Sequence, residues 1–386
     1  MTKLEELIQK LCPNGVEHKP LNEVSEMKRG TSITKKDIVE GEIPVVSGGR
    51  EPAYYCDKYN RDGETITVAG SGAGAGYVQY WTKPIFVCDA FSIQGNPGIQ
   101  TKYIYYFLTN IQDYIYSTKK GGGVPHVHIS SIENVSVPVP PLPVQREIVR
   151  ILDNFTELTA ELTAELTARK QQYAYYRDKL LTPRTDYRHV KIIDMLKQPI
   201  TDGPHTTPEL MEYGIPFLSV EAVFDGKIHF EKRRGNITPE FDAECCKKYK
   251  PQKHDIFMVK SGSTTGKVGY VDTDERFNIW SPLAAMRVNS ENSSRYLFHL
   301  LQSKMVQQQV VAKASHGSQP NLSMRALEQF DVVIPPLDIQ LRLANVLDNF
   351  DAICTDLNIG LPAEIEARQK QYEYYRDKLL TFTPAN

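Results

Sequence analysis

The stretch ARKQQYAYYRDKLLT, residues 168–182, returns almost unchanged as ARQKQYEYYRDKLLT at residues 367–381. A second pair of segments matches in the same way: VPPLPVQREIVRILDNF (139–155) and IPPLDIQLRLANVLDNF (334–350). The second copy is four residues longer between the two motifs. The chain is therefore an internal duplication in which each copy carries a globule followed by a nearly identical arm.

Both arms have the spacing of long helices. In the first, an apolar stripe at steps of four and three residues runs from Ile148 to Leu180, with polar interruptions at Thr159 and Arg169. This heptad pattern predicts a helix that needs a partner, and we expect the two arms to pack antiparallel about a pseudo-twofold axis. Gly360-Leu361-Pro362 should break or kink the second arm.

The globules combine strand-like runs, glycine-rich turns and a few helical stretches. We therefore predict an α+β (mixed α/β) fold, in which two similar strand-rich globules are separated by two long antiparallel coiled-coil helices. The predicted segments are the first globule (1–142), the first arm (143–182), the second globule (183–337) and the second arm (338–386).

The composition is that of an ordinary soluble globular protein, with 41% apolar and 24% charged residues. An apolar run long enough for a membrane span does not occur, and the N-terminal stretch is amphipathic rather than a signal peptide. The six cysteines form no CxxC pair, so we expect reduced thiols in a cytoplasmic protein. Because the formal net charge is −2, any binding of nucleic acid must come from local patches.

Two glycine-rich loops resemble nucleotide-binding motifs. GSGAGAG (70–76) and SGSTTGKV (261–268) each follow a strand-like run, but strand-like sequence rather than a helix comes next. A nucleotide-dependent enzyme built on these turns remains the alternative function. The hydroxyls and lysines of the second loop also suit a DNA phosphate or a base edge.

We identify no catalytic set and expect no metal site. His126 and His128 would share one strand face, yet the sequence offers no third ligand beside them. Basic clusters do occur, and each is either a solvated face or a nucleic-acid contact. They comprise Lys28-Arg29, Lys119-Lys120, Lys232-Arg233-Arg234 and the run of Lys247, Lys248, Lys250, Lys253, Lys260 and Lys267.

The whole chain resembles a DNA-specificity (S) subunit of a type I restriction–modification enzyme. The features that carry the resemblance are the two PPL…Q…LD-F segments, each followed by QYxYYRDKLL, and the TAEL tetrapeptides. The resemblance is to the IC-like subgroup of that family. The turns GGVPHVH (122–128) and GSQPNLS (317–323) resemble the glycine-polar turn that precedes the arm in the family.

The resemblance implies that each globule reads one half of a divided double-stranded DNA target and that the chain itself is non-catalytic. The arms would set the spacing and bind two modification subunits, which hold S-adenosylmethionine. Two restriction subunits would use ATP and Mg. No cofactor is expected in this chain.

The candidate DNA-contacting residues lie in the polar loops. In the second globule they are Lys260, Ser261, Ser263, Thr264, Lys267, Ser315, His316, Ser318, Gln319 and Asn321. In the first they are Lys119, Lys120, Gly122, His126 and His128, with Arg50 as a further candidate. The candidate subunit-docking residues are Tyr175, Tyr176, Arg177, Tyr374, Tyr375 and Arg376, although Tyr176 and Tyr375 also suit packing between the arms.

TAELTAELTA, residues 159–168, would act as a ruler on this interpretation. One four-residue unit turns a helix by about 400° and lengthens it by roughly 6 Å. That rise is close to one or two base pairs of DNA at about 3.4 Å each. We therefore expect the number of TAEL units to set the gap between the half-sites. The bases read by either half cannot be inferred from the sequence.

Overall fold

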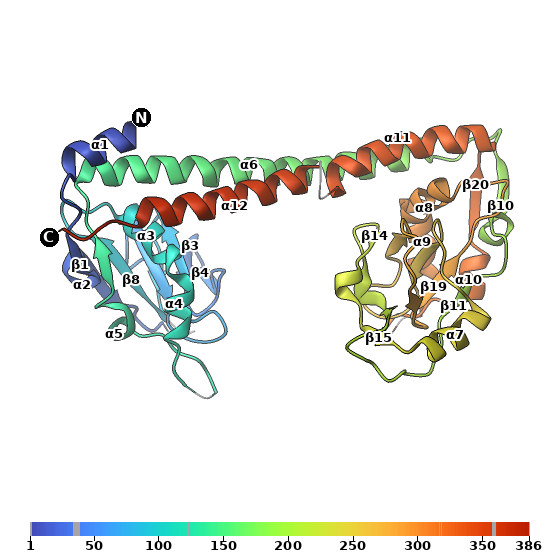
Figure 1. Cartoon of the computed structure of the whole chain (residues 1–386), viewed down its shortest axis with the longest axis horizontal. Coiled ribbons are helices and arrows are strands. Elements are labelled where there is room, and N and C mark those ends of the chain that lie inside the picture. Colours follow the sequence, from blue (N-terminus) through green and yellow to red (C-terminus); the bar gives the residue numbers. More distant parts are fainter. Residues whose placement is uncertain are drawn as a thin grey trace. The chain divides into compact units, whose positions relative to one another are not determined.

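A computed structural model describes residues 2–33, 39–121, 123–315, 317, 319–356 and 360–385 (Figure 1). The chain divides into two compact units, each of which combines one globule with parts of the arms. Unit 1 consists of Met1–Glu161 and Ile365–Asn386, and unit 2 of Leu162–Glu364. Both boundaries fall inside the arms, which the sequence division treats as separate segments.

The arms are helical, as their spacing predicts. Helix α6 runs without interruption over Leu142–Leu180 and contains every TAEL unit. The second arm consists of two helices, α11 (Leu337–Thr355) and α12 (Leu361–Leu380). The predicted break is therefore confirmed, and Pro362 lies in the first turn of α12, where its missing N–H is tolerated.

Unit 1 is built on a four-stranded antiparallel sheet in the order β2-β8-β5-β6. A three-stranded sheet, β4-β3-β7, and a strand pair, β1-β9, complete it. The bounds are α1 (Lys3–Leu11), β1 (His18–Pro20), α2 (Leu21–Val24), β2 (Ser25–Arg29), β3 (Ile43–Val46), β4 (Tyr54–Cys56), β5 (Thr65–Ala69), β6 (Val78–Trp81), β7 (Phe86–Val87), β8 (Ala90–Gly95), α3 (Thr101–Asn110), α4 (Gln112–Ser117), α5 (Ile129–Ile132) and β9 (Ser136–Pro138).

Unit 2 repeats this plan, with sheets β11-β19-β16-β17 and β15-β12-β18 and the pair β10-β20. It also carries a hairpin, β13-β14. The bounds are β10 (Arg188–Lys191), the 3-10 turn η2 (Ile192–Met195), β11 (Thr201–Asp202), β12 (Ile215–Leu218), η3 (Val220–Ala222), β13 (Val223–Phe224), β14 (Lys227–Ile228), η4 (Phe230–Lys232), β15 (Gly235–Ile237), α7 (Pro239–Lys248), β16 (Ile256–Val259), β17 (Val268–Tyr270), β18 (Asn278–Ile279), β19 (Leu283–Met286), α8 (Ser294–Gln302), α9 (Lys304–Lys313), α10 (Met324–Glu328) and β20 (Asp331–Ile334). The two units therefore share one topology, and the mixed α+β fold is as predicted.

The apolar stripe of α6 serves two purposes. Ile148 and Leu152 are fully buried in the core of the first globule, together with Ile66 of β5 and Ile104 of α3. The same cluster includes Leu380 of the second arm, so at this end the stripe packs against the globule as well as against the other arm. Burial of an aliphatic side chain contributes about 1.5–3 kcal/mol, so these residues anchor the globule on its arm.

Aromatic stacking pairs the arms within each unit. In unit 1, Phe155 of α6 stacks on Tyr375 of α12 with ring centroids 5.5 Å apart. In unit 2, Tyr176 of α6 stacks on Phe350 of α11 at 5.7 Å. These are equivalent pairs of the duplicated sequence, and the order of contacts along α6 and α11 is antiparallel, as predicted.

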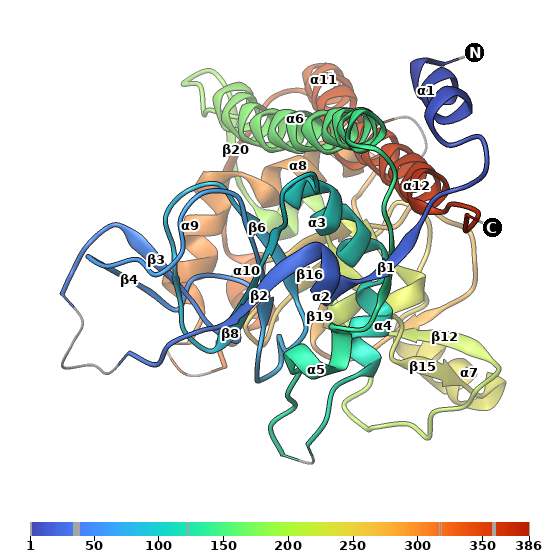
Figure 2. The same cartoon turned by 90° about the vertical axis from the view of Figure 1, so that its left-hand side faces the viewer.

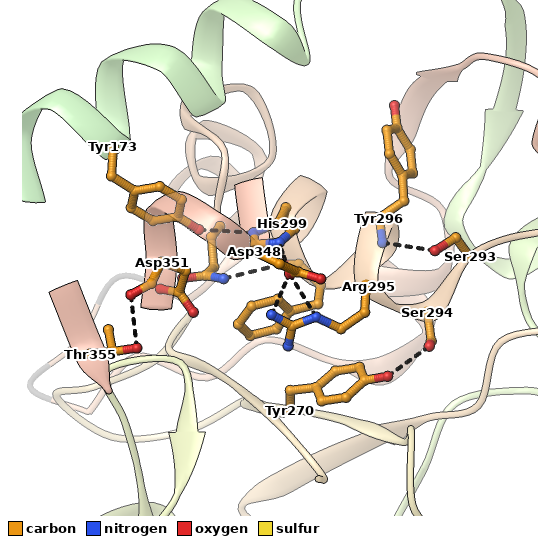
Figure 3. A network of polar contacts seen from close by, with 12 residues as sticks. Tyr173, Tyr270, Ser293, Ser294, Arg295, Tyr296, His299, Asp348, Asp351 and Thr355 are labelled. Atoms are coloured by element: carbon orange, nitrogen blue, oxygen red, sulfur yellow. Dashed lines mark hydrogen bonds and ion pairs between the residues drawn. The ribbon is translucent and has the colours of Figure 1, made fainter. Parts of the chain in front are cut away.

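In unit 2, a polar network that we call the second joint ties the globule to the arm (Figure 3). The buried ring of His299 on α8 lies between two arm residues: Nδ1 is 2.8 Å from the Tyr173 hydroxyl, and Nε2 is 2.6 Å from Asp348 Oδ1. Arg295, one turn earlier, also pairs with Asp348 and lies 4.5 Å from the centroid of the Tyr270 ring. All four polar groups thereby have a partner, with His299 and Tyr173 buried and Arg295 and Asp348 partly exposed.

The first joint, in unit 1, has the same geometry. The hydroxyl of Tyr106 on α3 donates to Asp153 Oδ1 of α6 at 2.5 Å. Lys102 Nζ lies 2.8 Å from the same carboxylate and 5.4 Å from the centroid of the Tyr80 ring. Tyr106 thus occupies the place that His299 holds in the second joint.

Candidate nucleic-acid interface

In each globule, two loops that are far apart in sequence come together, and we call each assembly a turn pair. The first turn pair joins residues 70–76, after β5, to residues 119–128, before α5. The second joins residues 260–266, after β16, to residues 315–323, before α10. Figures 1 and 2 show the segment between α4 and α5 on the side of its globule away from α6.

The two turn pairs have the same backbone frame. In the first, the N–H of Gly72 donates to the Pro125 carbonyl at 3.0 Å; in the second, the N–H of Gly262 donates to the Pro320 carbonyl at 2.9 Å. Gly72 and Gly262 have φ angles of +79° and +99°, a conformation that side-chain-bearing residues rarely adopt. The glycines are therefore required by the turn itself, and a bound phosphate is not needed to explain them.

The first turn pair brings most of its predicted residues together. Lys120 and His126 exchange backbone hydrogen bonds of 2.9 and 2.8 Å, and Ser71 bridges to His126. The rings of His126 and His128 are stacked with centroids 6.0 Å apart. Lys119 lies over the Tyr116 ring at 4.3 Å, which orients its ammonium group.

Arg50, the further candidate, belongs to the same neighbourhood. Its guanidinium lies 5.0 Å from the centroid of the Tyr77 ring, and its carbonyl accepts a hydrogen bond from the Gln79 side chain. Tyr77 directly follows the first glycine-rich loop, so Arg50 is held beside the first turn pair.

In the second turn pair, Ser315 and Asn321 are equivalent to Lys120 and His126. The N–H of Ser315 donates to the Asn321 carbonyl, and the N–H of Asn321 donates to Ser315 Oγ, both at 3.0 Å. Ser261 and Asn321 form an isolated antiparallel β-bridge, as Ser71 and His126 do in the first turn pair. Of the predicted contact residues, Thr264 is half-buried, and Ser263, Lys267, Ser315, Gln319 and Asn321 are exposed. Gly122, His316 and Ser318 lie outside the described residues.

Lys260 has a different environment from the one expected for a phosphate contact. Its side chain is 13% exposed, and its Nζ lies 3.2 Å from Oδ2 of the buried Asp202. Lys248 pairs with the other oxygen of that carboxylate, and His205 Nε2 approaches Oδ2 at 3.4 Å. A buried carboxylate needs such cations, so Lys260 first of all neutralises Asp202.

Acidic neighbours also neutralise much of the basic run around Lys260. Lys247 pairs with Glu244, and Lys253 lies 3.7 Å from Asp274. Lys267, in contrast, is exposed at the end of the glycine-rich loop. For most of the run, the interpretation as a solvated face is therefore the better one.

The glycine-rich loops lead into strands β6 and β17, and neither opens a helix. A dinucleotide or P-loop site needs a helix N-terminus at this point, so the structure does not support the nucleotide-dependent alternative. Within the described residues, no group of three His, Cys, Asp or Glu side chains could hold a metal ion. The same part of the chain contains no helix that is long and apolar enough to span a membrane.

The predicted docking residues fall into two sets. Tyr175 and Tyr374 are 60% and 62% exposed, so most of each ring faces solvent. Tyr176 and Tyr375 take part in the arm-to-arm stacks instead. Arg177 lies over the Tyr173 ring, and Arg376 donates to Asn110 Oδ1 at 2.8 Å, so both guanidinium groups contact their own unit.

Sequence reasoning missed the buried carboxylate of Asp202 and a stacked pair formed by Arg234 and Trp280, whose centroid distance is 3.8 Å. Arg234 belongs to a basic cluster that the sequence reveals. Its partner is 46 residues away, and only the sheet β15-β12-β18 brings the two together.

Comparison with known proteins places the chain in a family. A family model described as "Type I restriction modification DNA specificity domain" matches residues 13–169 and 190–367. A Haemophilus influenzae chain described as a type I restriction enzyme specificity subunit is 30% identical, with 99% of each chain covered. The Escherichia coli EcoR124I/EcoR124II specificity subunit is 33% identical over 73% of this chain and 70% of its own length.

A solved structure has the same fold. The S subunit of a type I restriction–modification system from M. genitalium superposes with a TM-score of 0.59, at 17% identity, covering 94% of this chain and 96% of its own. The double match of the family model also corresponds to the two units with one shared topology. The chain therefore belongs to the family of DNA-specificity subunits of type I restriction–modification enzymes.

Proposed function

We propose that each turn pair contacts one half of a divided double-stranded DNA target. The observation that carries this proposal is the contrast between backbone and surface. Both turn pairs keep the backbone hydrogen bonds that join their two loops, from Gly72 to Pro125 and from Gly262 to Pro320, while the side chains that they expose differ. Two readers of different half-sites need this combination, because a constant frame positions variable donors and acceptors in a groove.

Within each turn pair, lysines would contact phosphates and neutral polar groups would contact base edges. Lys119, Lys120 and Lys267 belong to the first class, and binding through them should weaken steeply with added salt. His126, His128, Ser263, Gln319 and Asn321 belong to the second class.

The test is to co-express the chain with its modification subunits and to map methylated adenines across a genome. A bipartite motif with a fixed gap is expected. Asn321→Ala and Gln319→Ala should alter one half of that motif, whereas Lys313→Ala, an exposed change on α9 outside the turn pair, should alter neither half. Methylation at ungapped sites would contradict the proposal.

The arms would bind the partner subunits. In this proposal two modification subunits carry S-adenosylmethionine and dock on the arms, two restriction subunits carry ATP and Mg, and this chain performs no catalysis. Tyr175 and Tyr374 are the best candidate contacts because their rings are exposed at equivalent positions. Changing both to Ala should reduce co-purification of the modification subunits, while Tyr213→Ala, in the second globule and 78% exposed, should not.

The continuous helix supports the ruler as a further part of the proposal. Because α6 is uninterrupted across the TAEL units, one inserted unit would lengthen it by roughly 6 Å. The methylated motif should then keep both half-sites and gain about one or two base pairs in the gap. An unchanged gap would refute the ruler and leave the assignment of the half-sites intact.

A further inference from the structure

A stacked arginine lies beside the second turn pair. The guanidinium of Arg234 is 3.8 Å from the centroid of the Trp280 ring. Both residues are held through β12: the N–H of Arg234 donates to the Phe217 carbonyl at 3.0 Å, and the N–H of Trp280 donates to the Leu218 carbonyl at 2.9 Å. The sheet therefore fixes both backbones, and the contact with the Trp280 ring restrains the flexible side chain of Arg234.

The stack is close to the second turn pair along the chain and in space. Pro282, two residues after Trp280, accepts a hydrogen bond of 2.9 Å from the N–H of Lys260. Lys260 opens the glycine-rich loop whose next residue, Ser261, bridges to Asn321. One continuous run of backbone contacts thus connects the Arg234–Trp280 stack to the polar residues proposed to meet DNA.

The edge of the Arg234 guanidinium is available to a ligand. The side chain is exposed, and among the described residues its guanidinium has no hydrogen bond or ion pair. Nearby arginines differ, because Arg276 and Arg287 pair with the buried carboxylates of Asp242 and Asp255. Trp280 Nε1 is buried without a partner in the described part of the chain, so the indole serves as a platform rather than as a donor.

Unit 1 lacks this feature at the equivalent positions. Ala53 donates to Val45 as Arg234 donates to Phe217, and Cys88 follows β7 as Trp280 follows β18. An alanine and a cysteine therefore stand where unit 2 has an arginine and a tryptophan. The frame of the sheet does not require the stack, so its presence in one unit alone points to a role in what that unit binds.

We propose that Arg234, held over the ring of Trp280, reads a guanine in the half-site that unit 2 recognises. A guanidinium presents two parallel donors along one edge, and guanine presents two acceptors, O6 and N7, in the major groove. Stacking leaves that edge free and reduces the rotamer freedom that the side chain loses on binding. The inference rests on the proposed function, because it assumes that the second turn pair faces DNA.

Methylation mapping of the whole complex tests the inference with four variants. Arg234→Ala and Arg234→Lys should both relax one guanine position in one half-site, by roughly 10- to 100-fold in preference over the other bases. Lysine keeps the positive charge but lacks the two parallel N–H donors of arginine. The Arg234→Lys variant therefore distinguishes recognition of a base from contact with a phosphate. The control is Arg233→Ala, which removes a neighbouring exposed guanidinium whose one hydrogen bond among the described residues is to the Phe230 carbonyl at 3.3 Å.

The outcomes distinguish the inference from the proposal beneath it. If the wild-type complex produces no bipartite motif, the proposed function fails. The guanine assignment is wrong if the motif is bipartite but the Arg234 variants keep every base preference. It is also wrong if Arg234→Lys behaves as wild type while Arg234→Ala weakens methylation at all sites equally. Trp280→Leu should reproduce part of the loss of preference, and unchanged preference in that variant would overturn the role of the platform.

Discussion

The two joints have the same architecture and different acid–base chemistry. In unit 1 a tyrosine donates to one arm carboxylate, whereas in unit 2 a histidine lies between a tyrosine and a carboxylate. Burial lowers the pKa of His299, although its bond to Asp348 opposes that shift. Burial raises the pKa of Tyr106 far above neutrality, so the first joint does not titrate through that group. A duplicated frame thus tolerates a change in chemistry as long as every buried polar group keeps a partner.

A second acidic residue, Asp351, increases the difference in acid–base chemistry between the two joints. Asp351 lies one turn after Asp348, and the duplication places Thr156 at the equivalent position in unit 1. Burial raises the pKa of Asp351 to about 6, despite nearby Arg295 and Lys227. Unit 2 therefore holds a carboxyl that ionises near neutrality, and unit 1 holds a hydroxyl in its place. Because burial lowers the pKa of His299 and raises that of Asp351, both groups contribute to the pH dependence of unit 2, and only variants can separate their contributions.

The largest expected effect comes from removing the shared carboxylate. Asp348→Ala leaves the buried His299 and the partly buried Arg295 without an acceptor, so we expect unit 2 to lose about 2–4 kcal/mol. Asp153→Ala should cost less, about 1–2 kcal/mol, because the first joint has one charged donor and a neutral tyrosine, and no buried histidine loses its partner. Equal losses would contradict the view that the second joint is the more strongly ionic one.

The chain offers a separate reporter for each unit in that experiment. It contains two tryptophans, Trp81 in unit 1 and Trp280 in unit 2. Urea unfolding followed by fluorescence in a Trp81→Phe background reports on unit 2. The same measurement in a Trp280→Phe background reports on unit 1.

Unlike the joints, the two aromatic stacks between the arms should contribute equally to the stability of their units. Phe155→Ala and Phe350→Ala remove equivalent half-buried rings, and each should cost about 2 kcal/mol, less than the value for a fully buried ring. The two single-tryptophan backgrounds provide the readout. A difference above about 1 kcal/mol would show that one unit depends more on its arm contact than the other.

Asp351→Thr copies the residue of unit 1 into unit 2 and tests the titration. The carboxyl has a folded pKa of about 6, above its ordinary value of 3.8, so its contribution is most favourable below pH 4 and is lost as the pH rises through 6. The variant should gain roughly 1–2 kcal/mol relative to wild type at pH 8, about half of that at pH 5 and little at pH 4. Unfolding of unit 2 across this range gives the comparison, and a gain independent of pH would refute the assignment.

The smallest expected effect concerns the two glycine turns. Gly72→Ala and Gly262→Ala each place a side chain at positive φ with no heavy atom within 4 Å. Each should therefore cost about 1 kcal/mol through backbone conformation alone. Thermal unfolding of the two variants should show similar shifts. A much larger loss in one of them would mean that its turn pair carries strain that the other lacks.

The sequence predicted the parts of the structure that depend on local pattern. The helical spacing of the arms, the break at Gly360 and the strands that flank the glycine-rich loops all follow from neighbouring residues. The sequence did not reveal that Ile148 and Leu152 of the helical stripe bury against the first globule as well as near the second arm. A stripe specifies which face of a helix is apolar, but not what covers it.

The candidate sites divide in the same way. Glycine, lysine and hydroxyl composition identified both turn pairs, but composition could not show that Lys260 belongs to a buried carboxylate 58 residues earlier. It also could not separate Arg234 from its neighbour Arg233, because what distinguishes them is a tryptophan brought beside one of them by a sheet.

By itself, the sequence determined the duplication, the two arms, the mixed fold and membership of a family, because repeats and periodicity are written in the order of residues. Only the tertiary structure decided which loops meet and which cations are neutralised. It also decided that Arg234 stacks on Trp280 and has no polar side-chain partner among the described residues. Those outcomes depend on strands pairing across tens of residues, so that backbone hydrogen bonds and burial bring together groups that have no relation along the chain.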